Sequence, residues 1–282
     1  MKNVLALTLL AMVAFAGNSI IARMALATES IGPLSFSLIR LLAGAMVLVL
    51  LASPKRAFSS GSWPGACCLL TYMVFFSYAY LSLDAGTGAL ILFATVQIVM
   101  IGSGIRQGER LSVVQWVGTA LACLGLVFLL LPGANTSVNL PGALMMGLSG
   151  SGWALYSLRG RHVDSPTWAT AGNFAKATVI VVLISIPLLL AMPEKVPQIK
   201  GIALAIASGS VTSGLGYALW YKVLGHLTAI RAGVAQLSVP AIAALGGMIF
   251  LSEVVTLRLL LTTAMVLGGV AIATLWQTSD AS

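Results

Sequence analysis

Residues 81–130 read LSLDAGTGALILFATVQIVMIGSGIRQGERLSVVQWVGTALACLGLVFLL, two apolar runs joined by a short charged turn. A shift of 144 positions aligns this stretch with residues 225–274, near the end of the chain. The aligned pairs include Leu83 with Leu227, Ala85 with Ala229, Glu109 with Glu253, and Gly125 with Gly269. A repeat of this length indicates one supersecondary unit, here a pair of helices, that is used twice.

The composition indicates a polytopic membrane protein. The 282 residues are 59% hydrophobic and only 8% charged, whereas soluble domains carry about a quarter charged residues. The net charge of +8 does not indicate nucleic acid as a partner, because most basic residues lie in short loops between apolar runs, as topology signals do. The three cysteines all lie within apolar runs, which favours packing over a disulfide framework. We expect no metal and no other cofactor.

Ten segments are long and apolar enough to span a bilayer, which takes about 20 mainly apolar residues. They are residues 3–26, 32–52, 63–83, 86–105, 111–131, 140–159, 167–191, 201–223, 227–250 and 255–276. The first segment imitates a signal peptide, with Ala14-Phe15-Ala16 as a candidate cleavage site. Its apolar run continues through Ile21, which favours a first transmembrane helix instead.

The uncharged loop at residues 132–139 divides the chain into residues 1–135 and residues 136–282, with five spans in each part. Because five is an odd number, the second half must enter the membrane in the opposite orientation to the first. The predicted fold class is therefore an all-α membrane protein of ten transmembrane helices, arranged as two inverted five-helix repeats. This arrangement is common in secondary transporters.

Lysine and arginine in the loops predict the orientation of the chain. If the N-terminus is cytoplasmic, nine basic residues fall on the cytoplasmic side: Lys2, Lys55, Arg56, Arg106, Arg110, Arg159, Arg161, Lys222 and Arg231. Three fall on the opposite side: Lys195, Lys200 and Arg258. We therefore expect a multi-pass protein of the bacterial inner membrane, surrounded by lipid, with both termini in the cytoplasm.

Both halves contain short motifs that fit one two-copy pattern. They are Ile39-Arg40-Leu41, Gly108-Glu109-Arg110, Gln115-Trp116-Val-Gly118 and Gly125 in the first half, and Tyr217-Ala-Leu-Trp220, Ser252-Glu253 and Gly268-Gly269 in the second. This pattern resembles the EamA domain of the drug/metabolite transporter superfamily. The chain length and the aromatic residues of spans 3, 6 and 8 are most similar to the YddG-type amino-acid exporters.

The resemblance implies a ten-helix export carrier. It also implies a central cavity lined mainly by spans 1, 3, 4, 6, 8 and 9, with spans 5 and 10 as an outer support. One departure concerns proline, which the family often places in the middle of span 4. Here Pro240 lies in span 9 and Val96 occupies the partner position in span 4, so we expect a straighter fourth span and a helix break near Pro240.

Two cations, Arg40 and Lys176, lie within spans 2 and 7, and a shift of 136 positions aligns their surroundings. Charges inside a membrane are costly and often functional, so both are candidate charge partners for a substrate carboxylate. The alternative is a structural contact with backbone carbonyls, or snorkelling toward the interface. The structural alternative is favoured here, because spans 2 and 7 are not the main cavity walls in the family.

No Asp or Glu lies deep in any predicted span. Proton-coupled carriers usually use an embedded carboxylate as the proton relay, so facilitated diffusion or exchange is at least as well supported as proton antiport. Glu109 and Glu253 come directly before spans 5 and 10. We expect each to cap its own helix, where a carboxylate meets the positive end of the helix dipole.

Six neutral side chains within the spans are the candidates for substrate binding: Asn18, Tyr78, Gln97, Trp153, Tyr217 and Gln236. An unpaired amide in hydrocarbon costs about 2–7 kcal/mol by transfer estimates, so the three amides must face protein or a wet cavity. Helix–helix contact and substrate binding stay equally open for them. The three aromatic residues are expected to lie deep in the membrane, which favours cavity lining over a place in the interfacial belt.

Two other classes of function were weighed. Residues 147–150 resemble the serine motif of rhomboid intramembrane proteases, but the serine would need a histidine within hydrogen-bond reach, and both histidines lie at predicted cytoplasmic ends. A passive channel would need a ring of charges or a filter loop. The sequence therefore predicts a secondary transporter, not an enzyme, that exports small metabolites by alternating access. Aromatic or other neutral amino acids are the favoured substrates, and the expected state is a monomer or a weak homodimer.

Overall fold

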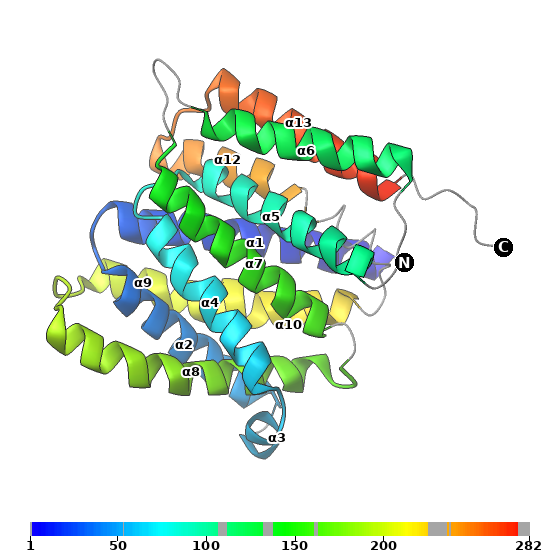
Figure 1. Ribbon diagram of the computed structural model, residues 1–282. Coiled ribbons are helices and arrows are strands. Elements are labelled where there is room, and N and C mark those ends of the chain that lie inside the picture. The colour runs from blue at the N-terminus through cyan, green and yellow to red at the C-terminus, as the bar shows by residue number, and fades with distance from the viewer. Residues whose placement is uncertain are drawn as a thin grey trace.

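The computed structural model describes residues 2–52, 54–106, 112–131, 138–160, 163–224, 236 and 238–275, and these are built from helices joined by short turns (Figure 1). The helices are α1 (Lys2–Ala27), α2 (Pro33–Ala52), α3 (Pro54–Ser59), α4 (Trp63–Ala79), α5 (Ala85–Arg106), α6 (Val113–Leu130), α7 (Leu140–Gly160), α8 (Pro166–Ala191), α9 (Ile199–Ala207), η1 (Ser208–Leu215), α10 (Gly216–Leu224), α12 (Ser238–Leu251) and α13 (Leu257–Leu275). The segment α9–η1–α10 is continuous. Counted as one helix, and with the short α3 set aside, the described part contains the ten predicted helices.

The membrane-protein prediction is confirmed at the level of composition and length. Six helices in the described ranges are long and apolar enough to cross a membrane, and shorter apolar helices accompany them. Most observed ends lie within two residues of the predicted ones, because the apolar runs stop at turn-forming residues such as Gly32 and Pro33. The beginning of span 9 lies outside the described residues.

One predicted helix end is corrected. The helix α4 ends at Ala79, four residues before the predicted end, because residues 80–83 fold into a turn in which the Leu83 N–H donates to the Ala79 carbonyl at 3.0 Å. Pro240 lies in α12. Because residues 225–235 and residue 237 lie outside the described residues, the helix break expected near Pro240 stays a prediction.

The caps of α6 and α13 differ from the expectation. Ser112 and Gln115 form a reciprocal capping box at the start of α6, and Glu109 lies outside the described residues. At α13 the Thr256 hydroxyl accepts from the Leu259 N–H at 3.1 Å. Glu253 lies further back in the α12–α13 loop, and its carboxylate instead binds the N-terminus of α5, as described below.

The pair α6 and α13 lies along one side of the bundle, and α5 connects this pair to the other helices (Figure 1). Glycine allows the close approach of the two helices: a Cβ atom at Gly269 would lie 2.5 Å from the Gly118 carbonyl oxygen. Small residues at a helix contact are the usual means of association in membranes. The two helices therefore form an outer layer.

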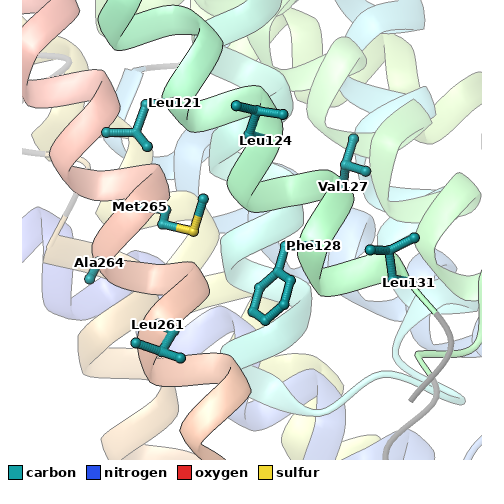
Figure 2. Close-up of a pocket in the computed structure, with 8 residues that line it drawn as sticks. All are labelled: Leu121, Leu124, Val127, Phe128, Leu131, Leu261, Ala264 and Met265. Atoms are coloured by element: carbon teal, nitrogen blue, oxygen red, sulfur yellow. The ribbon is translucent and has the colours of Figure 1, made fainter.

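The outer surface of this layer is an apolar groove of about 700 Å³ (Figure 2). Its lining residues are Leu121, Leu124, Val127, Phe128 and Leu131 from α6 and its end, and Leu261, Ala264 and Met265 from α13. A soluble protein would have to cover such a face, whereas in a membrane the face can meet lipid. The rest of the bundle packs as α4 on α7, α2 on α8, α5 on α12 and α1 on α12, and the buried centre lies among these helices.

Candidate functional site

The centre of the bundle is organised by an irregular stretch of helix. Residues Ser208–Leu215 form a π-helix between α9 and α10, and π-helical turns frequently occur at functional sites. Gly209 lets α2 lie directly against this stretch, because a Cβ atom there would overlap the Arg40 carbonyl oxygen. The sequence Ser-Gly-Ser-Val-Thr-Ser-Gly therefore combines a close backbone approach with several hydroxyl groups in the middle of an apolar span.

Asn18 on α1 is held by these hydroxyl groups. Its Oδ1 accepts from Ser208 Oγ at 2.9 Å and from Ser213 Oγ at 3.2 Å, and it also accepts from Thr212 Oγ1. Its Nδ2 donates to the Thr212 carbonyl at 3.2 Å and lies 3.5 Å from the Tyr217 hydroxyl. Of the two alternatives left open for Asn18, the structure supports contact between helices.

Arg40 on α2 is fully buried beside this cluster. Its Nε donates to Ser213 Oγ at 2.9 Å, and its Nη2 donates to the hydroxyls of Tyr72 and Tyr217, each at 3.1 Å. The two tyrosine hydroxyls are themselves 2.8 Å apart. The guanidinium carbon lies 4.8 Å from the centre of the Phe76 ring. All these partners are neutral, and Nη1 has no hydrogen-bond partner among the described residues.

An aromatic cluster continues from the two tyrosines. The Trp153 ring centre lies 4.8 Å from that of Tyr217, 5.0 Å from that of Tyr72 and 5.5 Å from that of Phe15. The rings surround a cavity of about 10 Å³, which we call the central chamber. Its lining residues are Phe15, Ser19, Tyr72, Phe76, Leu92, Phe93, Trp153 and Tyr217. A space of this size holds about one water molecule, so in this structure the chamber is closed to anything larger.

The two glutamines are both buried but differ in their contacts. Trp153 Nε1 lies 3.4 Å from Gln236 Oε1, so this amide joins the aromatic cluster. Gln97 is in α5, and its Nε2 has no hydrogen-bond partner within the described ranges. The structure thus brings Asn18, Trp153, Tyr217 and Gln236 into one connected group.

Tyr78 and Lys176 lie away from the chamber. Tyr78 precedes the last residue of α4 and lines a side groove with residues of α2 and α8. Its expected depth in the membrane stays a prediction. Lys176 donates through Nζ to the Ser60 carbonyl oxygen at 2.6 Å. This is the backbone contact favoured for Lys176 by the sequence, whereas Arg40 lies in the centre rather than at a carbonyl.

Three further groups at the centre were not predicted as site residues: Tyr72 with Phe76, the hydroxyl cluster of η1, and Phe15. The sequence could have indicated Tyr72 and Phe76, because residues four apart lie on one face of a helix and Tyr72 is in the middle of α4. The hydroxyl cluster of η1 was visible as a serine-rich and glycine-rich interruption of span 8. Phe15 gave no signal beyond its apolar character.

A second charged cluster lies at the end of the bundle that carries the α1–α2, α4–α5, α8–α9 and α12–α13 turns, which we call the acidic end. Arg23 Nε donates to Glu253 Oε1 at 3.0 Å, and Arg23 Nη2 to Asp84 Oδ1 at 3.3 Å. The other carboxylate oxygen of Glu253 accepts from the Ala85 N–H at 2.9 Å. Glu253 therefore caps α5 rather than α13. Burial raises the pKa of Glu253, outweighing the Ala85 N–H and Arg23, which lower it.

The N-terminus of α2 is capped from the same end. Glu194, in the turn after α8, accepts from the backbone N–H groups of Leu34 and Ser35 at 2.9 and 3.0 Å. A carboxylate at a helix N-terminus is favoured by the helix dipole. At the acidic end, two turns from the second half of the chain therefore hold helices of the first half.

Apolar helices that close around an aromatic chamber and a buried cation have the architecture of a polytopic membrane transport protein. The comparison with known families is specific. The chain belongs to the EamA-like transporter family, which matches residues 2–131 and again residues 140–275.

The chain is also similar to individual proteins. An uncharacterized protein of Pseudomonas aeruginosa is 46% identical over 275 residues, which is 96% of this chain and 94% of that protein. The threonine/homoserine exporter RhtA of Escherichia coli is 33% identical over 145 residues, or 51% of this chain and 48% of that protein. A solved crystal structure is similar with a TM-score of 0.66 at 20% identity, covering 95% of this chain and 99% of the other. The last comparison shows the fold alone.

Proposed function

We propose that this transporter exports small metabolites, with neutral amino acids as the favoured substrates, by alternating access across the inner membrane. The observation that carries the proposal is the closed central chamber, whose lining comes from α1, α4 and α5 of the first half and from α7 and α10 of the second. A site between two halves is what alternating access requires. The partial similarity to a threonine/homoserine exporter supports amino acids as the substrate class.

The proposed mechanism uses residues 1–135 and residues 136–282 as two inverted halves. The family matches the chain twice, which supports this division. The contacts between halves are also reciprocal: α1 packs on α12 while the counterpart pair α7 packs on α5, and α2 packs on η1 while α8 packs on α4. Replacing every helix by its counterpart in the other half therefore gives the same set of contacts, as a two-fold relation demands.

The closed chamber favours a carrier over a channel. A channel conducts through a continuous wet path, whereas the chamber has room for about one water molecule. Ser149, the candidate nucleophile of the protease alternative, is buried, and its hydroxyl donates to the Tyr72 carbonyl at 2.9 Å, a structural contact between α4 and α7. With no Asp or Glu inside any described helix, the proposed transport is facilitated diffusion or exchange.

The decisive experiment is transport into proteoliposomes of the purified protein with a panel of labelled amino acids, with and without an imposed pH gradient. Saturable uptake that unlabelled substrate inhibits, and that a pH gradient does not drive uphill, is the expected result. Flux that never saturates would establish a channel. Concentrative uptake driven by the pH gradient would refute transport without proton coupling.

The proposed orientation has its own test. With both termini in the cytoplasm, single cysteines at positions 57 and 108 should react with a membrane-impermeant reagent only from the cytoplasmic side. Cysteines at positions 135 and 197 should react only from outside. Reaction of position 135 from the cytoplasm would overturn the orientation or the number of spans before it.

A further inference from the structure

The charge of Arg40 is not balanced by any carboxylate in the described part of the protein. Arg40 is 0% exposed, its guanidinium stays protonated in proteins, and taking such an ion out of water costs several kcal/mol unless it is paired. The described ion pairs involve Arg23 and Lys195 only. No Asp or Glu lies within a described helix. A permanent cation at this depth therefore creates a site that favours an anion.

The hydrogen bonds of Arg40 leave a specific place for that anion. A guanidinium carries five N–H donors, and the bonds to Ser213, Tyr72 and Tyr217 start from Nε and Nη2. Both N–H groups on Nη1 are without a partner among the described residues. A bidentate carboxylate uses parallel N–H donors on two nitrogens, so a substrate carboxylate would bind Nη1 and replace a tyrosine hydroxyl on Nη2.

Arg40 lies directly behind the wall of the central chamber and is not one of its lining residues. Tyr72, Phe76 and Tyr217 contact the guanidinium, and the same three residues line the chamber. A ligand that opened the chamber would therefore meet the arginine next to the faces of Trp153 and Phe15. Those faces provide apolar contact for a side chain and cation–π attraction for an ammonium group.

We propose that Arg40 is the anchor for a substrate carboxylate, so that the protein accepts amino acids and related monocarboxylates and rejects amines, amides and cationic drugs. This inference rests on the transport function proposed above and adds its selectivity. The tyrosine hydroxyls hold the guanidinium in place while the chamber is empty. The bound carboxylate then supplies the negative charge that the protein itself does not place there.

Matched ligands test this without any mutation. The probes are L-threonine and L-phenylalanine, the amide of each, and 3-phenylpropionate, which keeps the carboxylate but lacks the ammonium group. Binding is measured by thermal stabilisation of the purified protein and by competition with labelled L-phenylalanine. The acids should bind at least about tenfold more tightly than the amides, since hydrogen bonds to charged groups contribute about 1.5–3 kcal/mol. Equal binding of acid and amide would overturn the inference, even if amino-acid transport is confirmed.

Variants then assign the preference to Arg40. Arg40→Gln should lose the preference for acid over amide, and Arg40→Lys, which keeps the charge but not the fork, should keep a weaker one. The matched control is Lys176→Gln, because the aligned lysine already binds the Ser60 carbonyl, and it should keep the full preference. An acid preference that persists in Arg40→Gln would refute the proposed anchor.

The same measurements separate this inference from the proposed function. Suppose that no amino acid is transported, yet 3-phenylpropionate stabilises the wild type and fails to stabilise Arg40→Gln. This result would support the carboxylate site and refute amino acids as the transported substrates. If amino acids are transported but Arg40→Gln selects acid over amide as the wild type does, the transport function stands and the anchor falls.

Discussion

Arg23 and Arg40 lie on neighbouring helices, α1 and α2, and have opposite surroundings. Arg23 meets two carboxylates and two backbone carbonyls at the acidic end. Arg40 meets three hydroxyls and two aromatic faces in the centre. Paired charges hold elements together, whereas an unpaired charge is available to a visiting ligand. The difference separates a structural arginine from a candidate binding arginine.

The acidic end also bears on the proposed transport cycle. Glu253 joins the α12–α13 turn to Arg23 on α1 and to the start of α5, and Glu194 joins the α8–α9 turn to the start of α2. Both contacts connect the two halves of the chain. In an alternating-access cycle, opening the chamber toward this end requires that these contacts separate, while Arg40 exchanges its neutral partners for substrate.

The largest expected effect comes from breaking the aromatic wall of the centre. Trp153→Ala removes a buried ring that contacts Phe15, Tyr72 and Tyr217, so the free energy of unfolding should fall by about 3–5 kcal/mol. Transport per folded molecule should fall most for bulky amino acids. Denaturant unfolding and proteoliposome transport measure the two effects.

The control for that variant is Trp116→Ala in α6. The Trp116 side chain is 55% exposed and belongs to the outer layer, so its loss should change stability by less than about 0.5 kcal/mol. Substrate preference should not change. Altered selectivity in Trp116→Ala together with unchanged selectivity in Trp153→Ala would show that the substrate site lies on other helices than those proposed.

A smaller effect is expected from breaking the paired charges of the acidic end. Glu253→Ala leaves the Ala85 N–H without its acceptor and leaves Asp84 as the remaining carboxylate on Arg23, which should cost about 1–3 kcal/mol of unfolding free energy. The same change weakens the connection between halves, so a cysteine placed in the chamber wall should react faster with reagents added from that side. Unchanged stability and unchanged reactivity would show that this cluster does not hold the end closed.

The glutamines should affect transport by up to about tenfold, the equivalent of one neutral hydrogen bond. Gln97→Ala and Gln236→Ala should each lower the transport of every amino acid, because the proposed contacts reach the part that all amino acids share. Initial rates for threonine and phenylalanine, compared in each variant, measure this. A loss confined to one of the two substrates would assign the glutamine to side-chain selection instead.

The sequence predicted the helices well and their inward faces less well. Helix ends follow local rules, so turns such as the one at Gly32 and Pro33 were readable. Tyr72 was not chosen as a candidate, although Tyr72, Phe76 and Tyr80 repeat every four residues and share one helical face, from which Tyr78 is offset. A role for Tyr78 in substrate binding stays a prediction.

Contacts between residues far apart in the chain could not be predicted from the sequence. Glu253 and Ala85 are 168 positions apart, and a carboxylate directly before a helix is normally expected to cap that helix. Arg40 was correctly identified as an unusual charge. Its neutral surroundings became visible only when α2, α4 and η1 were packed together, because burial without a counter-ion is a property of the whole bundle.

The pH dependence of stability tests the paired charges of the acidic end more finely. Burial raises the pKa of Glu253 above 4.5 in the folded protein, so the folded state keeps this proton to a higher pH than the unfolded state. The resulting stability is complete below pH 4.5 and is lost as the pH rises through the raised pKa. Thermal unfolding of the wild type should show this decline, and Glu253→Gln should remove it. An identical pH profile in the two proteins would contradict the burial of this carboxylate.

The smallest effect is expected at the exposed pair of the same end. The hydrogen bond and the charge of Lys195 lower the pKa of Glu29 below 4.5, so its contribution is present above that pH and is lost as the pH falls through the lowered pKa, opposite in sign to that of Glu253. Both side chains are exposed, and salt screens such pairs. Glu29→Gln should therefore leave the melting temperature unchanged at physiological salt, while Glu253→Gln changes its pH dependence. A salt-resistant loss of stability in Glu29→Gln would show that this pair, too, holds the acidic end together.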